Sequence, residues 1–400
     1  MVSAALKYGT IVAVVVAVFY QLFLKTLIFV GMGVGRHVQP ISDFPYQCRK
    51  IQDERLQACE DMWLSEETRQ LFFACSDPFA RQQWMPNFDR FNVSGRSRTD
   101  AVVAMDIDKP KGNSFEYRVL KTPSYQTGDG HLYLVGLTGK DKPNGIDIAL
   151  VNGRPPRDRE TGEYLDASNS GGDFSIELFE TGAHATELRH KETFEHAEIK
   201  TPNNVAFRPG GGFYITNDHG TAKAGWKFHL APFINNGDVT YCDVKGSCGI
   251  VSTSHAFPNG LHFSTRHNAL LVPSAHTGGI KVYTPNTPHP ELTQTSSIPI
   301  PYPIDNLSED SNGDIWVPAF PKGLEVLKAY ADPLGFTAAT TVFRVRRQGE
   351  EWEVEKVLED REGEVLPGAT AVVHDARTGR VFLSGVVAPF VSVCEPVGRK

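Results

Sequence analysis

The sequence predicts an all-β protein: a six-bladed β-propeller, closed by a disulfide between its two ends and preceded by an N-terminal hydrophobic anchor helix. Three observations predict this class: short apolar strands between turn residues, an internal repeat of about 50 residues, and oxygen-bearing side chains that recur in turn-like settings. The 36 glycines and 26 prolines favour many turns over long helices. The predicted organisation is a signal-anchor at residues 1–38 and one propeller domain at residues 39–400.

The N-terminal segment combines a basic residue with a long apolar run. Lys7 precedes the apolar block 11–24, Lys25 interrupts the run, and the run ends before Arg36. If the Lys25 ammonium reaches the interface along its flexible side chain, residues 8–34 can cross a bilayer core of about 30 Å. The preferred interpretation is an uncleaved signal-anchor, and the alternatives are a cleaved secretory signal or a buried helix of a soluble protein. The first two interpretations place the propeller in the secretory pathway, either lumenal or extracellular on a membrane anchor, or secreted.

The cysteines agree with an oxidising compartment. There are six, and an even number in a lumenal chain suggests disulfides. Two of the expected bridges are local and the third joins the start of the globular region to its end: Cys242–Cys248, Cys59–Cys75 and Cys48–Cys394. Free buried thiols are the alternative, and no cysteine or histidine spacing predicts a zinc site.

The part of the chain beyond residue 40 contains short predicted strands and a weak internal repeat. Beyond residue 40, short apolar runs alternate with glycine, aspartate and asparagine turns, which is typical of sandwiches, barrels and propellers. Segments 201–216, 257–272 and 304–317 share an asparagine, an apolar residue, a short turn and an apolar strand. Their spacing is near a propeller's blade period, and about 360 residues at roughly 50–60 per blade correspond to about six blades. The polar segment 139–144 is expected to be a loop.

The charge and one sequon bear on partners. The net charge of −7 is spread along the chain, and without a basic stripe nucleic acid is excluded as a main partner. The expected partners are a hydrophobic small-molecule substrate and, through the N-terminal segment, a membrane. Asn92 begins an Asn-Val-Ser sequon, which predicts a glycoprotein.

A set of carboxylate and amide side chains predicts a metal. These residues lie in turn-like settings and are spread over almost 250 positions: Glu60, Asp61, Asn203, Asn204, Asn259, Asp305 and Asn306. Calcium prefers six to eight oxygen ligands, from carboxylates and amide carbonyls alike. Since each blade of a propeller returns to the central axis, the sequence predicts a calcium ion at the centre.

The order and spacing of several motifs resemble those of the serum paraoxonase/arylesterase family. This family lies within a wider superfamily of six-bladed calcium propellers that includes gluconolactonases and strictosidine-synthase-like proteins. The resemblance extends from about Cys48 to Cys394. Its motifs are Cys-Glu-Asp at 59–61, Asn-Gly-Ile at 144–146, Ile-Glu-Leu-Phe at 176–179, Thr-Asn-Asp-His at 216–219, Phe-Pro-Asn-Gly at 257–260, Lys-Val-Tyr at 281–283 and Ile-Asp-Asn-Leu-Ser at 304–308.

The resemblance implies two calcium ions. A catalytic-type calcium would be held by Glu60, Asn203, Asn259, Asp305 and Asn306. A second, structural calcium would involve Asp61, the backbone carbonyl of Ile146, and Asn204. Asn204 departs from the acidic residue usual at that position, and a neutral amide attracts a divalent ion less strongly.

The same resemblance implies chemistry from a histidine pair, and here the chain departs from the family. The first histidine position corresponds to Asn144 and the second to about Gly153. An amide cannot take up a proton as imidazole does near neutral pH. The predicted catalytic residues are Asp305, which would activate water as a calcium-bound carboxylate, Asn144 at the first histidine position, and His219 as a base. Further candidate bases are Asp147, His255 and His276.

Three functions follow as hypotheses. The first is a calcium-dependent hydrolase of hydrophobic lactones or aryl esters, in which the ion polarises the carbonyl. The second is a non-hydrolytic enzyme of natural-product biosynthesis, a cyclase such as a hetero-Diels–Alderase or an isomerase, which the missing histidines favour. For this second function Phe257 and Phe320 would shape an apolar pocket, and the alternative is that they are ordinary core aromatics. The third is a propeller that binds without catalysis.

Overall fold

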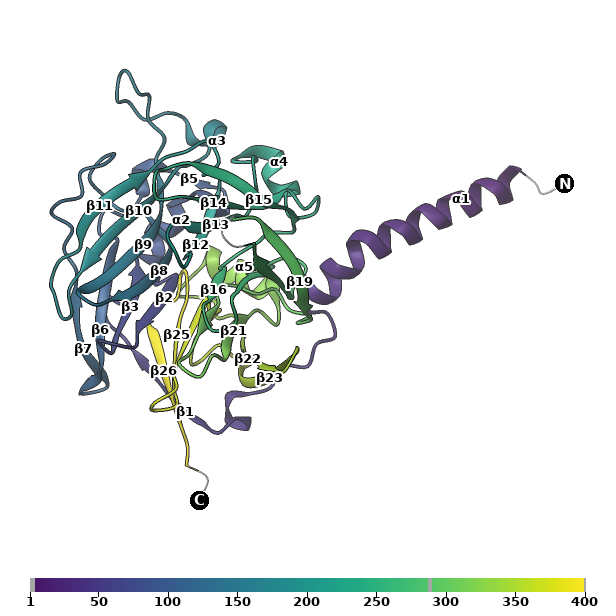
Figure 1. The fold of residues 1–400 in the computed structure, drawn as a ribbon. Helices are drawn as coiled ribbons and strands as arrows, with labels where there is room; N and C mark the ends of the chain where they lie inside the picture. Colours follow the sequence, from purple (N-terminus) through teal and green to yellow (C-terminus); the bar gives the residue numbers. More distant parts are fainter. Residues whose placement is uncertain (1–3, 287–289, 399–400) are drawn as a thin grey trace.

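The propeller has six blades, as predicted, and each blade is a four-stranded antiparallel sheet. This computed structural model describes residues 4–286 and 290–398. Figure 1 shows the blades around a common centre and one helix that projects away from them. The first strands of neighbouring blades contact one another around the ring. They therefore bring segments far apart in the sequence to one axis.

The blades follow one another along the chain. Blades one to three consist of β2 Asp61–Ser65, β3 Gln70–Cys75, β6 Ala101–Lys111 and β7 Ser114–Val119; β8 Leu134–Lys142, β9 Gly145–Arg154, β10 Asp173–Thr181 and β11 Arg189–Phe194; and β12 Pro202–Phe207, β13 Phe213–Asn217, β14 Gly237–Cys242 and β15 Cys248–His255. Blades four and five consist of β16 His262–Ser264, β17 Ala269–Pro273, β18 Ile280–Pro285 and β19 Leu292–Ile298; and β20 Ser308–Glu309, β21 Ile315–Ala319, β22 Thr340–Gln348 and β23 Glu351–Asp360.

The sixth blade closes the ring. It combines β24 Ala371–Asp375, β25 Arg380–Ser384 and β26 Val391–Pro396 with β1 Tyr46–Ile51 from the other end of the chain. Cys48 lies opposite Cys394 in the β1–β26 register and forms a disulfide with it across 346 residues. All three expected bridges are confirmed, because Cys59–Cys75 and Cys242–Cys248 are also present.

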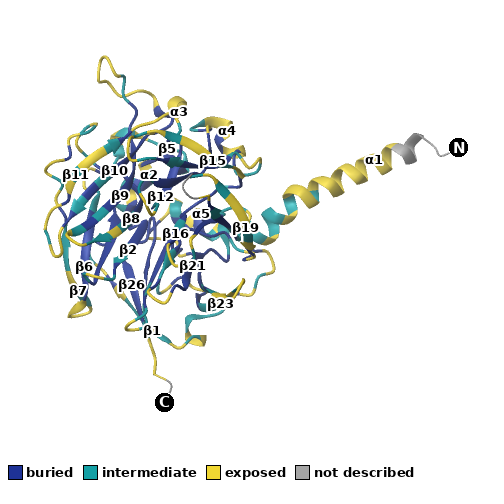
Figure 2. Ribbon diagram, viewed as in Figure 1, coloured by how far each residue is buried: buried dark blue, intermediate teal, exposed yellow. Residues whose placement is uncertain are grey.

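The core lies between the blades. The second strands β3, β13, β17 and β21 are buried along their whole length. Their apolar side chains on both faces pack against the neighbouring blades, so the strands read as continuous apolar runs rather than as alternating ones. Figure 2 shows the buried inner strands and the exposed outer strands and loops.

Short helices and turns cover one end of the propeller. They are α2 Pro78–Gln83, the two-stranded ribbon β4 Trp84–Met85 with β5 Arg90–Phe91, the turns η4 Pro86–Phe88 and η5 Val93–Gly95, and the helices α3 Ala167–Ser170, α4 Gly225–Leu230 and α5 Gly323–Ala331. Asp77 starts α2 because its carboxylate accepts a hydrogen bond from the Ala80 N–H at 2.7 Å, and Pro78 follows at the first helical position.

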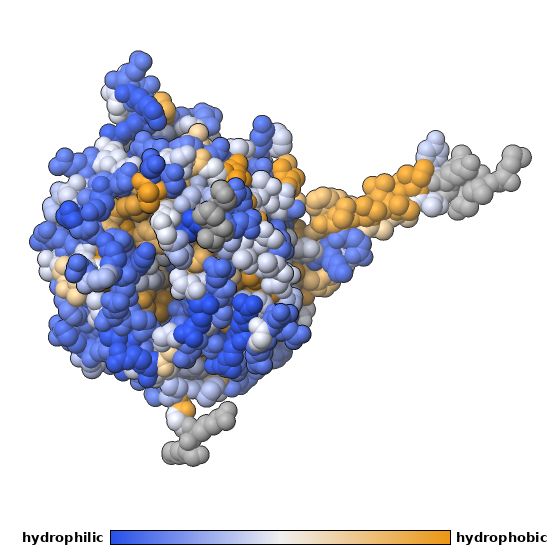
Figure 3. All heavy atoms as spheres, viewed as in Figure 1, coloured by the Kyte–Doolittle hydropathy of each residue, from blue (hydrophilic) through white to orange (hydrophobic). Residues whose placement is uncertain are grey.

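The N-terminal helix leaves the propeller. It comprises α1 Ala4–Phe19 and the continuing turns η1 Tyr20–Leu24 and η2 Leu27–Gly31. The 24 residues Tyr8–Gly31 are long and apolar enough to cross a membrane. Figure 3 shows this helix as an apolar rod beside a mostly hydrophilic propeller surface. Membrane anchorage itself stays a prediction, since a secretory signal has the same length and composition.

Arg36 fixes the base of this helix to blade five. Its guanidinium donates to the carbonyl oxygens of Pro321 at 2.6 Å and Pro301 at 2.5 Å. It also lies 3.8 Å from the centre of the Tyr302 ring. The side chain that ends the apolar run therefore joins the helix to the globular domain.

Candidate metal centre

The predicted oxygen donors meet where the first strands begin. Glu60 precedes β2, Asn203 is in β12, Asn259 precedes β16 and Asp305 precedes β20. Hydrogen bonds connect these strand starts across the axis. Asn306 Nδ2 donates to the Glu60 carbonyl at 3.0 Å. Repeating units of the propeller thus place the same kind of polar turn at one point in the molecule.

Four of these residues carry a buried side-chain oxygen that has no hydrogen-bond partner among the described residues. The atoms are Glu60 Oε2, Asn203 Oδ1, Asn259 Oδ1 and Asp305 Oδ1. Each side chain is at most 5% exposed. An unpaired buried polar group costs about 1–3 kcal/mol, so a cluster of them calls for a partner. A hard cation satisfies such a set, and these oxygens fit calcium.

The fifth expected ligand, Asn306, differs in one respect. Its Oδ1 already accepts a hydrogen bond from Asn204 Nδ2 at 2.9 Å. An amide oxygen has two lone pairs, so Asn306 keeps one for an ion. Gly260 allows this packing, because a Cβ atom there would lie 2.2 Å from the Asn306 Cα.

The electrostatics of the centre also favour a cation. Burial, with a further contribution from Asp61, raises the pKa of Glu60 to about 8, although Arg81 acts in the opposite direction. Burial and the neighbouring Glu60 raise the pKa of Asp305 well above its ordinary value. Carboxylates in such surroundings are stabilised as anions when a positive charge is near. Among the described residues no cluster of three or more histidine, cysteine, aspartate or glutamate side chains forms a ligand set, and this centre instead relies partly on asparagine.

The donors expected for a second ion already have hydrogen-bond partners. Asp61 Oδ1 accepts from the Met62 N–H at 2.8 Å, and its Oδ2 accepts from the Leu137 N–H at 2.9 Å. Asn204 Nδ2 donates to the same Asp61 Oδ2 at 2.9 Å. These oxygens are satisfied within the protein, in contrast to the four unpaired ones.

Asn144 and Ile146 were expected beside the other predicted site residues, and the fold places them elsewhere. Segment 139–144 is not a loop, because β8 continues to Lys142 and pairs with β9. Asn144 lies in the hairpin turn that follows, and Ile146 pairs with Asp141 and Thr181. The structure therefore places both residues at the end of β8 that is remote from Leu137, which contacts Asp61.

His219 is held close to the centre by blade three. It is 3% exposed, and its Nδ1 lies 2.8 Å from Oδ1 of Asp218. Its ring stacks on Phe228 with the centroids 3.7 Å apart, and Phe257 lies 4.8 Å away. The backbone N–H of His219 donates to Oγ1 of Thr201 at 3.1 Å. Thr201 lies two residues before Asn203. A histidine oriented by a carboxylate is the usual arrangement of a catalytic base.

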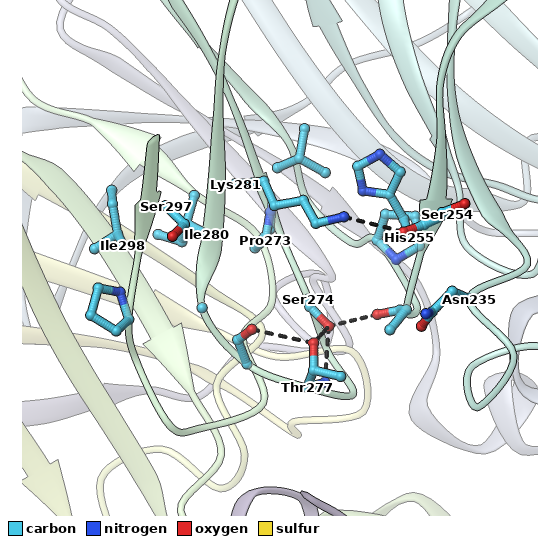
Figure 4. A pocket seen from close by; sticks show the side chains of 16 residues that line it. Asn235, Ser254, His255, Pro273, Ser274, Thr277, Ile280, Lys281, Ser297 and Ile298 are labelled. Atoms are coloured by element: carbon cyan, nitrogen blue, oxygen red, sulfur yellow. Dashed lines mark hydrogen bonds between the residues drawn. The ribbon is translucent and has the colours of Figure 1, made fainter. Parts of the chain in front are cut away.

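The other candidate bases are held by different contacts. Asp147 forms an ion pair with Lys142 beside the β8–β9 turn, and His276 packs against Phe233 at 4.6 Å. His255 lines a cavity of about 360 Å³ between blades three and four. Figure 4 shows His255 and Lys281 in this cavity, and none of the centre's oxygen donors lines it. Burial lowers the pKa of His255 to about 3.

Sequence reasoning missed a cap over the centre, which we define as α2, η4 and α5. Asn87 of η4 is 3% exposed, and its Nδ2 donates to Asp218 Oδ2 at 2.9 Å and to the Pro202 carbonyl at 3.2 Å. Its Oδ1 has no partner among the described residues. Tyr330 of α5 packs edge-on against Phe88 at 4.8 Å. Burial raises the pKa of Tyr330 well above its ordinary value, and Asp305 and Glu60 add to this effect.

The remaining position of interest is Gly153, where the resemblance places the second histidine. Its carbonyl accepts a hydrogen bond from Trp84 Nε1 at 2.8 Å. A side chain at this position would meet Phe174 at 3.2 Å and Val135 at 3.5 Å, so its surroundings are apolar. Phe320 lies with Tyr330 and Val326 in a buried apolar cluster beneath α5. The surroundings of the centre are thus largely aromatic, apart from His219, Asp218, Arg81 and Asn87.

The chain is similar in sequence to known proteins and similar in fold to solved structures. A family model described as Arylesterase matches residues 158–393. Serum paraoxonase/arylesterase 1 of Mus musculus is 25% identical over 298 residues, which are 69% of this chain and 81% of that protein. The structure of a luciferin-regenerating enzyme superposes with a TM-score of 0.51 at 11% identity and covers 88% of this chain and 96% of that one. The structural likeness shows the fold alone.

Proposed function

The chain belongs to the arylesterase family, and from this premise we propose that it is a calcium-dependent hydrolase of hydrophobic lactones or aryl esters. The observation that carries the proposal is the set of four buried, unpaired oxygens on Glu60, Asn203, Asn259 and Asp305. These side chains, with Asn306, would hold the ion. When bound, calcium supplies a Lewis acid that polarises the carbonyl of the substrate.

His219 is the proposed general base. Because its Nδ1 faces the Asp218 carboxylate, that nitrogen carries the proton and Nε2 keeps a free lone pair. Nε2 would take a proton from the water that attacks the acyl carbon, and would return it to the leaving oxygen. Asn87 holds the second oxygen of Asp218, so a cap residue helps to orient the base.

The surroundings of the centre support a hydrophobic substrate. Phe257 and Phe228 flank His219, and Phe320 packs against the α5 residues Val326 and Tyr330. Such walls bind apolar groups and exclude bulk water around the reacting bond. The apolar N-terminal helix would hold the protein at a membrane, from which substrates of this kind partition.

One observation favours a second candidate, a non-hydrolytic cyclase or isomerase. Gly153 carries no ionisable side chain at the second histidine's expected position, and Phe174 and Val135 lie where such a side chain would be. Pericyclic ring closures and isomerisations depend on a shaped, water-poor pocket and a polarising group more than on two bases. The aromatic cap and the proposed ion would supply both.

The deciding experiment is a hydrolysis assay on the full chain in detergent. A panel of lactones and aryl esters is tested with calcium, with a chelator, and after calcium is restored. We expect hydrolysis that disappears on chelation and returns with calcium. A folded, calcium-containing protein that hydrolyses no member of the panel would instead support the cyclase or isomerase.

A further inference from the structure

Asn204 lies where the family resemblance implies a second calcium. We propose that the side-chain amide of Asn204 takes the place of that ion, so that the protein binds a single calcium per chain. The proposal rests on the calcium of the proposed function for the first ion, and it concerns only the number of ions and the role of Asn204.

The hydrogen bonds of Asn204 show how the amide acts. Its Oδ1 accepts from the Val205 N–H at 2.7 Å, which fixes the orientation of the amide. Its Nδ2 then donates to Asp61 Oδ2 and to Asn306 Oδ1, each at 2.9 Å. The NH₂ group thus supplies two positive dipole ends to oxygens from two blades, as a bridging cation would.

Both oxygens of Asp61 already accept hydrogen bonds. Its Oδ1 accepts from the Met62 N–H, and its Oδ2 accepts from both Asn204 and the Leu137 N–H. The three donors offset part of the cost of burying this carboxylate without a metal. The Ile146 carbonyl, the third expected ligand, belongs to the β8–β9 hairpin near Asp141, and Leu137 is the β8 residue that contacts Asp61 instead.

Strand β8 packs closely against the residues around Asn204. A Cβ atom at Gly136 would lie 2.6 Å from the Asn203 carbonyl oxygen and 2.8 Å from Asn204 Oδ1. Strand β8 therefore approaches the start of β12 at the distance that only glycine permits. A side-chain amide fills the space between Asp61 and Asn306.

The charge of the centre is consistent with one ion. Glu60, Asp61 and Asp305 bring three carboxylates, and one divalent cation with the nearby Arg81 offsets all three charges. An aspartate at position 204 would add a fourth carboxylate within hydrogen-bond distance of Asp61. That repulsion is relieved by a second cation, which an asparagine does not require.

The test counts calcium on the full chain in detergent. The protein is stripped with a chelator, reloaded with calcium, and passed through calcium-free gel filtration before elemental mass spectrometry. We expect one calcium per chain in the wild type and two in Asn204→Asp. The matched control Asn113→Asp, in the exposed β6–β7 turn, is expected to keep one. Asn204→Ala, which removes the donors without adding a charge, is also expected to keep one and covers the case in which Asn204→Asp does not fold.

Two calcium ions in the wild type would overturn the inference, and so would none, or a single ion in folded Asn204→Asp. Hydrolysis is measured on the same samples to separate this result from the proposed function. One calcium without hydrolysis contradicts the hydrolase and leaves the inference standing. Two calcium ions per chain together with hydrolysis would support the hydrolase and overturn the inference.

Discussion

The side chain of Asn306 donates a hydrogen bond to the carbonyl of Glu60 at 3.0 Å, although 246 residues separate them. Thr370 Oγ1 donates to the same carbonyl at 2.7 Å. The starts of blades five and six thus fix the backbone beside a proposed ligand from blade one. Because the ring is closed by β1 and β26, the centre is assembled only when the whole propeller has formed.

Removal of calcium is expected to destabilise the folded protein. The ion would bind oxygens that are otherwise buried without partners, and it has no comparable site in the unfolded chain. Free calcium at 100 times its dissociation constant stabilises a protein by about 2.7 kcal/mol. Thermal unfolding with and without chelator measures this effect. An unchanged midpoint would show that no ion is held by the folded state.

Asn259→Ala is expected to weaken calcium binding by at least the roughly 10–100-fold loss seen when outer-shell partners of metal sites are changed. The substitution removes one unpaired oxygen and leaves the strand β16 unchanged in sequence. Titration against a calcium-chelating dye gives the dissociation constant. Asn113→Ala, at an exposed turn, serves as the control and should bind as the wild type does. Equal affinity in both variants would place the ion elsewhere.

His219→Gln is expected to lower kcat for hydrolysis by about 10²–10⁴-fold, because it removes the proposed base. Calcium affinity should stay within the wild-type range, since His219 contributes no ligand. Asp218→Asn should also lower kcat, because Nδ1 of His219 would lose the carboxylate that fixes its tautomer. Steady-state kinetics on the calcium-loaded variants check both expectations. A His219→Gln enzyme as active as the wild type would exclude this residue as the base.

His255 is expected to make stability depend on pH. Burial, helped by Lys281, lowers its pKa to about 3 in the folded protein, whereas the unfolded value is about 6.5. Below about pH 6.5 the unfolded chain therefore binds a proton that the folded protein does not bind. Stability is complete above that pH, falls by up to about 1.4 kcal/mol per pH unit down to about pH 3, and then levels off.

The variant His255→Gln checks this slope, because glutamine keeps a polar group near Ser252 and does not titrate. Denaturant unfolding from neutral to acidic pH should give a shallower dependence than in the wild type. His196→Gln, at an exposed position, is the control and should keep the wild-type slope. If all three slopes coincide, His255 makes no contribution to acid sensitivity.

Much of the fold could be predicted from the sequence because a propeller repeats. The segments that begin near Asn203, Asn259 and Asp305 share one local pattern, and each occupies the start of a first strand. The disulfides were accessible for a similar reason, since two of the pairs are local and only one pairing then remained. Local sequence patterns were therefore enough to predict both the architecture and most of the proposed ligands.

The parts that could not be predicted depend on packing between unlike segments. Residues Gly139–Lys142 are polar enough to suggest a loop, yet they pair with β9 and move the hairpin turn to Asn144. Asn87 gains its place only because the non-repeating cap folds over blade three. The sequence identified Asn204 as a neutral departure, but only the hydrogen bonds show that its amide faces Asp61.

The most direct test of the central claim is the position of the ion in a crystal of calcium-loaded protein. Anomalous diffraction should show calcium at the axis, within about 2.3–2.6 Å of oxygens from Glu60, Asn203, Asn259 and Asp305. These four oxygens without an ion between them, in crystals grown with saturating calcium, would contradict the account.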